Sequence, residues 1–345
     1  MRSHFVTLRG MGNPVLIELT RGSLVESTHA GTLAIAGADG AIAGSIGDIG
    51  RPVFPRSAIK PLQALPFVKS GALERFGFGA PEIAIACASH SGTPRHAALV
   101  AAMLARAGLT PAALGCGVHE PMDAASARAL IKAGTAPSAL HHNCSGKHAA
   151  MLATAVHLGE PVEGYWRPDH PVQTRIRSLL EDLAGCRLGA DVCGIDGCSV
   201  PNWAIPPAGL ATAFARLSTG HGLGPDRARA CARIVQACWA DPELVAGPGR
   251  LDTLMMARLG GKVLMKSGAE GVHCGALPER GLGFALKIDD GAKRGAETVV
   301  AELIARFYPQ ARDLGPDTRL RNWRGLEVGE VRPSAALAAL LASLA

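Results

Sequence analysis

The sequence contains few aromatic residues, since Phe, Trp and Tyr make up only 4% of its 345 residues. The hydrophobic core is therefore expected to consist mainly of Ala, Leu, Val and Ile. Lysines and arginines are scattered and the net charge is +6, whereas nucleic-acid binders concentrate their cations in a patch or stripe. We therefore expect no nucleic-acid partner. No run of about 18 apolar residues is free of charges and breakers, so we expect no membrane span.

The N-terminus also lacks the features of a signal peptide. Residues 1–22 contain neither a continuous apolar stretch of the required length nor a small-residue cleavage pattern, and we therefore expect a cytoplasmic protein. The nine cysteines are odd in number, widely spaced and mostly embedded in apolar segments. In a large chain without a secretion signal, this pattern predicts reduced thiols or metal ligands and not a disulfide framework.

What the sequence does contain is a globular composition, with 48% apolar and 19% charged residues. Short strand-like runs fill the first fifty residues and return at 262–266, 272–276 and 283–288. The first runs are separated by glycines typical of hairpin turns, namely Gly22, Gly31, Gly37 and Gly40. Between the two groups of runs the pattern is helical, with a helical sub-lobe around 143–220. We predict a single α+β domain over 1–345, in which an antiparallel-rich sheet from both ends of the chain packs against helices.

Ser57 and Lys60 form an S-x-x-K motif. Residues three apart on a helical turn share a face, with about 5–6 Å between their Cβ atoms. A lysine can take the proton of a serine hydroxyl only if burial or another cation lowers its pKa, and Arg56 is a neighbouring cation. Pro61 favours a helix start at this point, where free backbone N–H groups can stabilise an oxyanion. The motif alone is weak evidence, because it also fits a capping serine followed by an exposed lysine.

The K-S-G motif occurs twice, at Lys69 and at Lys266. Lys69 closes a predicted helix and is explained by a C-terminal cap. Lys266 ends an apolar strand-like run, which is the context of K-[ST]-G in penicillin-recognising serine enzymes. Ser89 follows another apolar run, and it is either a helix N-cap or a second hydroxyl in the same cleft as Ser57 and Lys266.

Together these motifs resemble the Rhizobium-type L-asparaginases, the asparaginase II family. The resemblance extends from about residue 15 to residue 287, and its motifs occur in the family's order: R-S-A-I-K-P-L-Q at 56–63, A-S-H-S-G at 88–92, H-H-N-C-S-G-K-H at 141–148, D-G-C at 196–198 and K-S-G-A-E-G at 266–271. It implies a catalytic domain with a fold like that of serine β-lactamases and class A glutaminases, and a homodimer.

The resemblance also implies two Ser–Lys pairs that hydrolyse a small-molecule substrate, L-asparagine. Ser57, activated by Lys60, would attack the side-chain carbonyl and release ammonia. Ser89 and Lys266 would handle protons and position the water that hydrolyses the acyl-enzyme. The residues themselves leave open which of the two serines attacks.

A zinc site is a further implication of the resemblance, with Cys144, Lys147 and Cys198 as its ligands. Two thiolates suit zinc, but a lysine must be deprotonated to serve as a ligand, and cysteines are also commonly buried as small apolar residues. Such a zinc ion would tune substrate binding, because no motif predicts a metal-activated water. No motif predicts an organic cofactor either.

Asparagine carries an α-ammonium and an α-carboxylate, and both groups need partners. By side-chain type, Asp196 is the candidate for the ammonium group, and Arg56, Asn143 and His90 are candidates for the carboxylate. Three other functions remain open. They are a glutaminase that differs only in pocket size, a β-lactamase-like serine hydrolase, for which the missing signal peptide is unfavourable, and a non-catalytic zinc-binding protein.

Overall fold

The computed structural model of the protein describes residues 12–344. Residues 1–22 were expected to contain no signal peptide, and the first eleven of these lie outside the described residues. The strands are β1 Val15–Arg21, β2 Leu24–Gly37, β3 Ile42–Ile46, β4 Cys193–Ile195, β5 Pro201–Trp203, β6 Leu264–Ser267, β7 Val272–Leu277, β8 Leu282–Ile288, β9 Arg319–Arg321 and β10 Glu327–Pro333. The helices are α1 Lys60–Gln63, α2 Leu65–Lys69, α3 Ala72–Phe76, α4 Ala80–Ala86, α5 Pro94–Arg106, α6 Ala124–Lys132, α7 Ser145–Leu158, α8 Pro171–Ala184, α9 Pro207–Thr219, α10 Pro225–Ala240, α11 Pro242–Val245, α12 Leu251–Leu259, α13 Lys293–Phe307 and α14 Ala335–Ser343.

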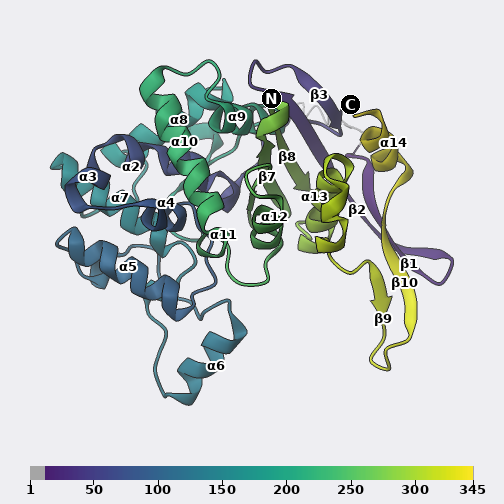
Figure 1. Ribbon diagram of the computed structural model, residues 1–345, viewed down its shortest axis with the longest axis horizontal. Helices are drawn as coiled ribbons and strands as arrows, with labels where there is room; N and C mark the ends of the chain where they lie inside the picture. Colours follow the sequence, from purple (N-terminus) through teal and green to yellow (C-terminus); the bar gives the residue numbers. More distant parts are fainter. Residues whose placement is uncertain (1–11, 345) are drawn as a thin grey trace, which may run out of the picture.

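Eight of the strands form one sheet, in the order β6-β7-β8-β2-β1-β10-β9, with β3 also paired to β2. All of these pairings are antiparallel. The long strand β2 joins the halves of the sheet, because its first part pairs with β1 and its second part with β8. The predicted α+β class, with an antiparallel sheet built from both ends of the chain, is confirmed (Figure 1).

Two predicted details of the sheet are wrong. Gly31 is not a turn, because β2 continues through it from Leu24 to Gly37. A Cβ atom at Gly31 would lie 2.3 Å from the carbonyl oxygen of Lys287, so the glycine permits the close approach of β8. The prediction also missed β9 and β10, whose side chains are largely exposed and include many charges that hide a strand pattern.

The helices form a layer on the sheet and a separate helical part. Helix α9 packs on β8, β2 and β7, and α13 packs on β7, β8, β1 and β10. Gly283 lets the backbone of α9 approach β8, because a Cβ atom there would meet the carbonyl oxygen of Ala211 at 2.0 Å. Helix α14 packs on β1 and β3, and α12 packs on β6, whereas α2, α4, α5, α7, α8 and α10 pack on one another beside the sheet (Figure 1). The range 143–220 thus contains α7 and α8 of the helical part together with α9 of the sheet layer.

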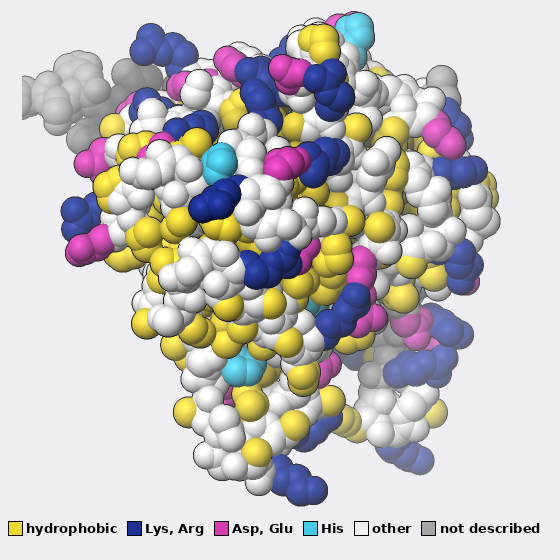
Figure 2. Space-filling model, turned by 60° about the vertical axis from the view of Figure 1, so that its left-hand side comes forward, with side chains coloured by type: hydrophobic (Ala, Val, Ile, Leu, Met, Phe, Trp, Pro, Cys, Tyr) yellow, Lys and Arg dark blue, Asp and Glu magenta, His cyan; other side chains and the backbone are white. Residues whose placement is uncertain are grey.

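A single cluster of buried apolar side chains connects the sheet with the helical part. On the face displayed in Figure 2, lysines and arginines alternate with acidic side chains and form no continuous basic stripe. Within residues 12–344, no helix has both the length and the hydrophobicity needed to cross a bilayer. The site described next lies where β6 meets the start of the helical part.

Candidate active site

The backbone around Ser57 is constrained. Arg56–Ile59 forms one turn of 3₁₀-helix, and α1 follows with Pro61 in its first turn, so the predicted helix start is confirmed. Arg56 has a positive φ of 52°, in the left-handed region that side-chain-bearing residues seldom adopt. The Nε of Arg56 donates a hydrogen bond of 2.6 Å to Asp196 Oδ1, which holds the residue before Ser57 in this conformation. Backbone strain of this kind concentrates at functional sites.

Ser89 lies in the segment that follows α4, and its hydroxyl is the shared partner of two lysines. The Nζ atoms of Lys60 and Lys266 each lie 3.0 Å from Ser89 Oγ. Lys60 also donates to the carbonyl oxygens of Ala88, at 2.5 Å, and Asn143, at 3.4 Å. Both lysines are fully buried. The fold therefore joins residues as far as 177 positions apart in one buried polar cluster.

The two serines line the same cavity, which has a volume of about 220 Å³. Ser57 is partly exposed there, and Ser89 retains 7% of its surface. The other lining side chains include Met122, Asn143, Arg250, Ser267, Glu270 and Glu297. Drug-sized ligands occupy cavities of about 300–1,000 Å³, so this cavity suits a small metabolite.

The environment of Lys266 favours its neutral amine. Burial lowers the pKa of Lys266 from 10.5 to about 7; the Asp252 carboxylate opposes this shift, and the charges of Lys60 and Arg250 support it. A buried amine with a pKa near 7 can accept a proton at neutral pH, which is the requirement for a general base. The contact with Ser89 Oγ places that base next to a hydroxyl.

The predicted pairs differ in detail from the observed contacts. Ser89 and Lys266 are in contact, as expected. Lys60, however, donates to Ser89, Ala88 and Asn143, and no hydrogen bond among residues 12–344 joins it to Ser57. The long Lys60 side chain is buried and extends to the segment after α4, where two carbonyl groups and a hydroxyl are available to its amine.

The predicted substrate-binding residues fall into different places. Asn143 lines the cavity. Arg56 and Asp196 are paired with each other, and Arg56 lines an adjoining cavity of about 670 Å³. His90 is fully buried and does not reach the substrate cavity. Its Nδ1 accepts the Gly92 N–H at 3.1 Å, so its Nε2 carries the proton and contacts Ser145 Oγ at 2.9 Å.

The predicted zinc ligands converge in a buried cluster. Lys147 Nζ donates to Cys198 Sγ at 3.1 Å, and the Cys198 thiol donates to Asp196 Oδ2 at 3.5 Å. The neighbouring Cys198 lowers the pKa of Cys144. Burial opposes the charge on Lys147, but the two sulfur atoms and Asp196 outweigh it and raise the pKa of Lys147. No group of three or more His, Cys, Asp or Glu residues within 12–344 could hold a metal. A zinc ion here would need both sulfur atoms and the Lys147 amine, and the amine would first have to lose the proton that its neighbours favour.

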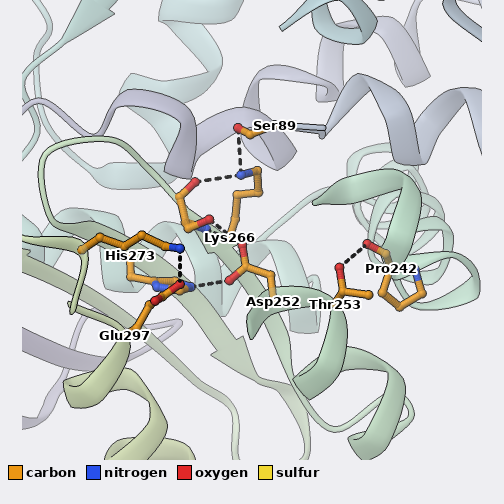
Figure 3. A network of polar contacts seen from close by, with 9 residues as sticks. Ser89, Pro242, Asp252, Thr253, Lys266, His273 and Glu297 are labelled. Atoms are coloured by element: carbon orange, nitrogen blue, oxygen red, sulfur yellow. Dashed lines mark hydrogen bonds and ion pairs between the residues drawn. The ribbon is translucent and has the colours of Figure 1, made fainter. Parts of the chain in front are cut away.

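Asp252 and His273 belong to the polar network but were not predicted from the sequence. Asp252 is 2% exposed and accepts hydrogen bonds from the N–H and the hydroxyl of Ser267, at 2.8 and 2.7 Å, and contacts His273 Nε2 at 2.7 Å. Figure 3 shows these residues next to Lys266 and Ser89. The only signal in the sequence is an aspartate in the first turn of a helix, which normally indicates dipole compensation.

Comparison with known proteins gives one family and several distant structures. The L-asparaginase II family model matches residues 17–333. No curated protein is a significant match. A crystal structure of a protein named Mglu is 17% identical, with a TM-score of 0.40, over 88% of this chain and 72% of that one. A β-lactamase from Mycobacterium bovis is 14% identical, with a TM-score of 0.37, over 82% of this chain and 92% of that one. These structural similarities are distant and carry no argument about activity.

Proposed function

The chain belongs to the L-asparaginase II family, an amidohydrolase family, and from this premise we propose that it hydrolyses L-asparagine to L-aspartate and ammonia. The observation that carries the proposal is the position of Ser89 Oγ, 3.0 Å from the amines of both Lys60 and Lys266. Ser89 lies in the wall of a cavity that Ser57 also lines, with the two lysines buried behind it. Amide hydrolysis by serine needs a hydroxyl and a neutral base in one pocket, and this arrangement supplies both.

In the proposed mechanism Ser57 is the nucleophile. It is the more exposed of the two hydroxyls, and within residues 12–344 no hydrogen bond occupies its side chain. In penicillin-recognising enzymes the serine of S-x-x-K attacks, and a lysine of K-[ST]-G lies beside it.

In the proposed mechanism, the lysine–serine contacts provide the route along which protons are transferred. Ser57 Oγ bonds to the side-chain carbonyl carbon of asparagine, and its proton enters the group formed by Lys60, Ser89 and Lys266. The C–N bond then breaks, and the leaving amine takes a proton from this group to depart as ammonia. A water molecule hydrolyses the resulting ester, so that aspartate leaves and the proton returns to Ser57.

The lining of the cavity supports an amino-acid substrate. Arg250 and Glu270 carry opposite charges, and no hydrogen bond or ion pair of either charged group is present within residues 12–344. An α-carboxylate and an α-ammonium would find complementary partners in these two side chains. The pair formed by Arg56 and Asp196 is already neutralised, so it positions Ser57 and is less suited to direct recognition of the substrate.

The zinc ion implied by the family resemblance would be held by Cys144, Cys198 and Lys147. It would supply a positive charge close to the catalytic lysines, and in this role it would tune substrate affinity. The cytoplasmic location and the homodimer stay predictions.

The proposal is tested by ammonia release and by trapping the acyl-enzyme. We expect the wild-type protein to release ammonia from L-asparagine, more slowly from L-glutamine, and to hydrolyse no chromogenic β-lactam. Rapid acid quenching followed by peptide mass spectrometry should find an aspartyl ester on the peptide that contains Ser57. An ester on Ser89 would make Ser89 the nucleophile. No ammonia release from asparagine would refute the proposed function.

A further inference from the structure

Asp252 connects two strands at the base of the candidate active site. Its Oδ2 accepts both the N–H and the hydroxyl of Ser267, the last residue of β6, and its Oδ1 contacts Nε2 of His273 in β7. Ser267 and His273 are directly opposite each other in the antiparallel pair. One buried carboxylate therefore fixes both members of a cross-strand pair; Figure 3 shows Asp252 beside His273.

The same pair determines where the Lys266 amine lies. Lys266 Nζ donates to the carbonyl oxygen of Ser267 at 2.7 Å and also contacts Ser89 Oγ at 3.0 Å. The carbonyl oxygen of Ser267 thus accepts a hydrogen bond from Lys266, and the N–H and hydroxyl groups of Ser267 donate to Asp252. A shift of Ser267 would move the lysine away from Ser89, although Asp252 itself does not line the cavity.

Asp252 also acts on Lys266 through its charge. Burial alone would raise the pKa of Asp252, but His273 and Lys266 outweigh it and keep the carboxylate ionised. The charged and titratable groups that face Lys266 are Asp252, Lys60, Arg250, Cys87, Cys144 and Cys274. Asp252 is the anionic carboxylate of this set. Its charge raises the pKa of Lys266, whereas the cations Lys60 and Arg250 lower it.

We propose that Asp252 is a positioning residue for the reaction, which clamps the end of β6 to β7 so that the Lys266 amine stays on Ser89. This inference rests on the proposed function, because it assigns Lys266 a role in proton transfer. A buried aspartate that only stabilised the fold would affect the fraction of folded protein. A positioning residue also changes the turnover of the folded protein, and it does so only when Lys266 is present.

The test is the Asp252→Asn variant, which is isosteric and lacks the charge, measured with L-asparagine across pH 5–9. We expect kcat to fall by about 10- to 100-fold with KM within about twofold, since the lost interaction acts on proton transfer and not on substrate binding. The acid limb of the kcat profile should move to lower pH by about one unit, because the anion that favours the charged amine is gone. Loss of folded protein would reduce the amplitude without moving the limb.

A double-mutant cycle isolates the route through Lys266. In a Lys266→Met background, Asp252→Asn should cause no further loss of kcat, because the two residues act as one unit. Additive losses, or an Asp252→Asn enzyme with wild-type kcat and pH profile, would overturn the inference. A wild-type protein that hydrolyses asparagine keeps the proposed function valid in either case, so the two failures are distinguishable.

A second variant covers the case in which Asp252→Asn does not fold. Ser267→Ala removes one hydrogen bond from the carboxylate at a partly exposed residue and leaves the N–H contact in place. We expect kcat to fall by about threefold or more, again with no additional loss in the Lys266→Met background. An unchanged kcat in Ser267→Ala would overturn the inference.

Discussion

Ser89 makes the contact on which the proposed chemistry depends, and Ser89→Ala tests it most directly. The substitution removes one oxygen atom, and with it a shared partner of two fully buried lysines. The amines of Lys60 and Lys266 then lose the polar atom between them, while both keep their carbonyl partners.

The expected magnitude follows from the number of lost contacts. A hydrogen bond contributes about 0.5–1.5 kcal/mol to stability, so the loss of two should lower the free energy of unfolding by about 1–3 kcal/mol. Because Ser89 is also the proposed proton relay, kcat for asparagine should fall by about 10²- to 10⁴-fold.

Ser57→Ala is the matched control, because it removes the same atom from a partly exposed residue that has no hydrogen-bonded side chain within the described residues. Its free energy of unfolding should stay within about 0.5 kcal/mol of wild type, although its ammonia release should be lost. Urea unfolding and ammonia release at pH 8 measure both quantities for each variant. A Ser89→Ala protein that is as stable and as active as wild type would refute the assignment of the lysine–serine group.

Three further predictions concern charge. The kcat/KM of the wild type should rise with pH through about 7, where Lys266 loses its proton, and a profile that is flat from pH 6 to 9 would exclude Lys266 as the base. Arg56→Ala and Asp196→Ala should each reduce kcat/KM, and the double variant should lose no more than the worse single variant, because the two residues form one ion pair; additive losses would contradict a joint role. If Cys144 and Cys198 bind zinc with Lys147, metal analysis should find about one equivalent of zinc, which Cys144→Ser removes with a rise in KM; metal-free wild-type protein with an unchanged KM would argue against this role.

The candidate serines and lysines could be selected from the sequence because each lies in a short motif with a recognisable local context. Lys266 lies next to the end of β6 and Pro61 marks a helix start, and both features are local. The sequence could not predict that Lys60 contacts Ser89, because that contact depends on how the segment after α4 packs. His90 illustrates the same limit, since only the fold shows that both of its ring nitrogens are used internally.

The fold class was also predictable, whereas the edges of the sheet were not. Strand β7 is completely buried and gives a clear apolar run. Strand β9 is mostly exposed and rich in arginine, so local pattern gives no reason to prefer a strand over a loop. Asp252 was missed because a single aspartate near a helix start is common, and its function depends on Ser267 and His273, which lie on two different strands.

The long separation between Lys266 and Ser89, 177 positions along the chain, has a consequence for refolding. Contacts between distant segments form slowly, because closing a large loop is costly in chain entropy. Helices of the middle region can form early from neighbouring residues, but the proposed proton route requires β6 to have docked against the segment after α4. Recovery of ammonia release after dilution from denaturant should therefore lag behind recovery of the helical circular-dichroism signal.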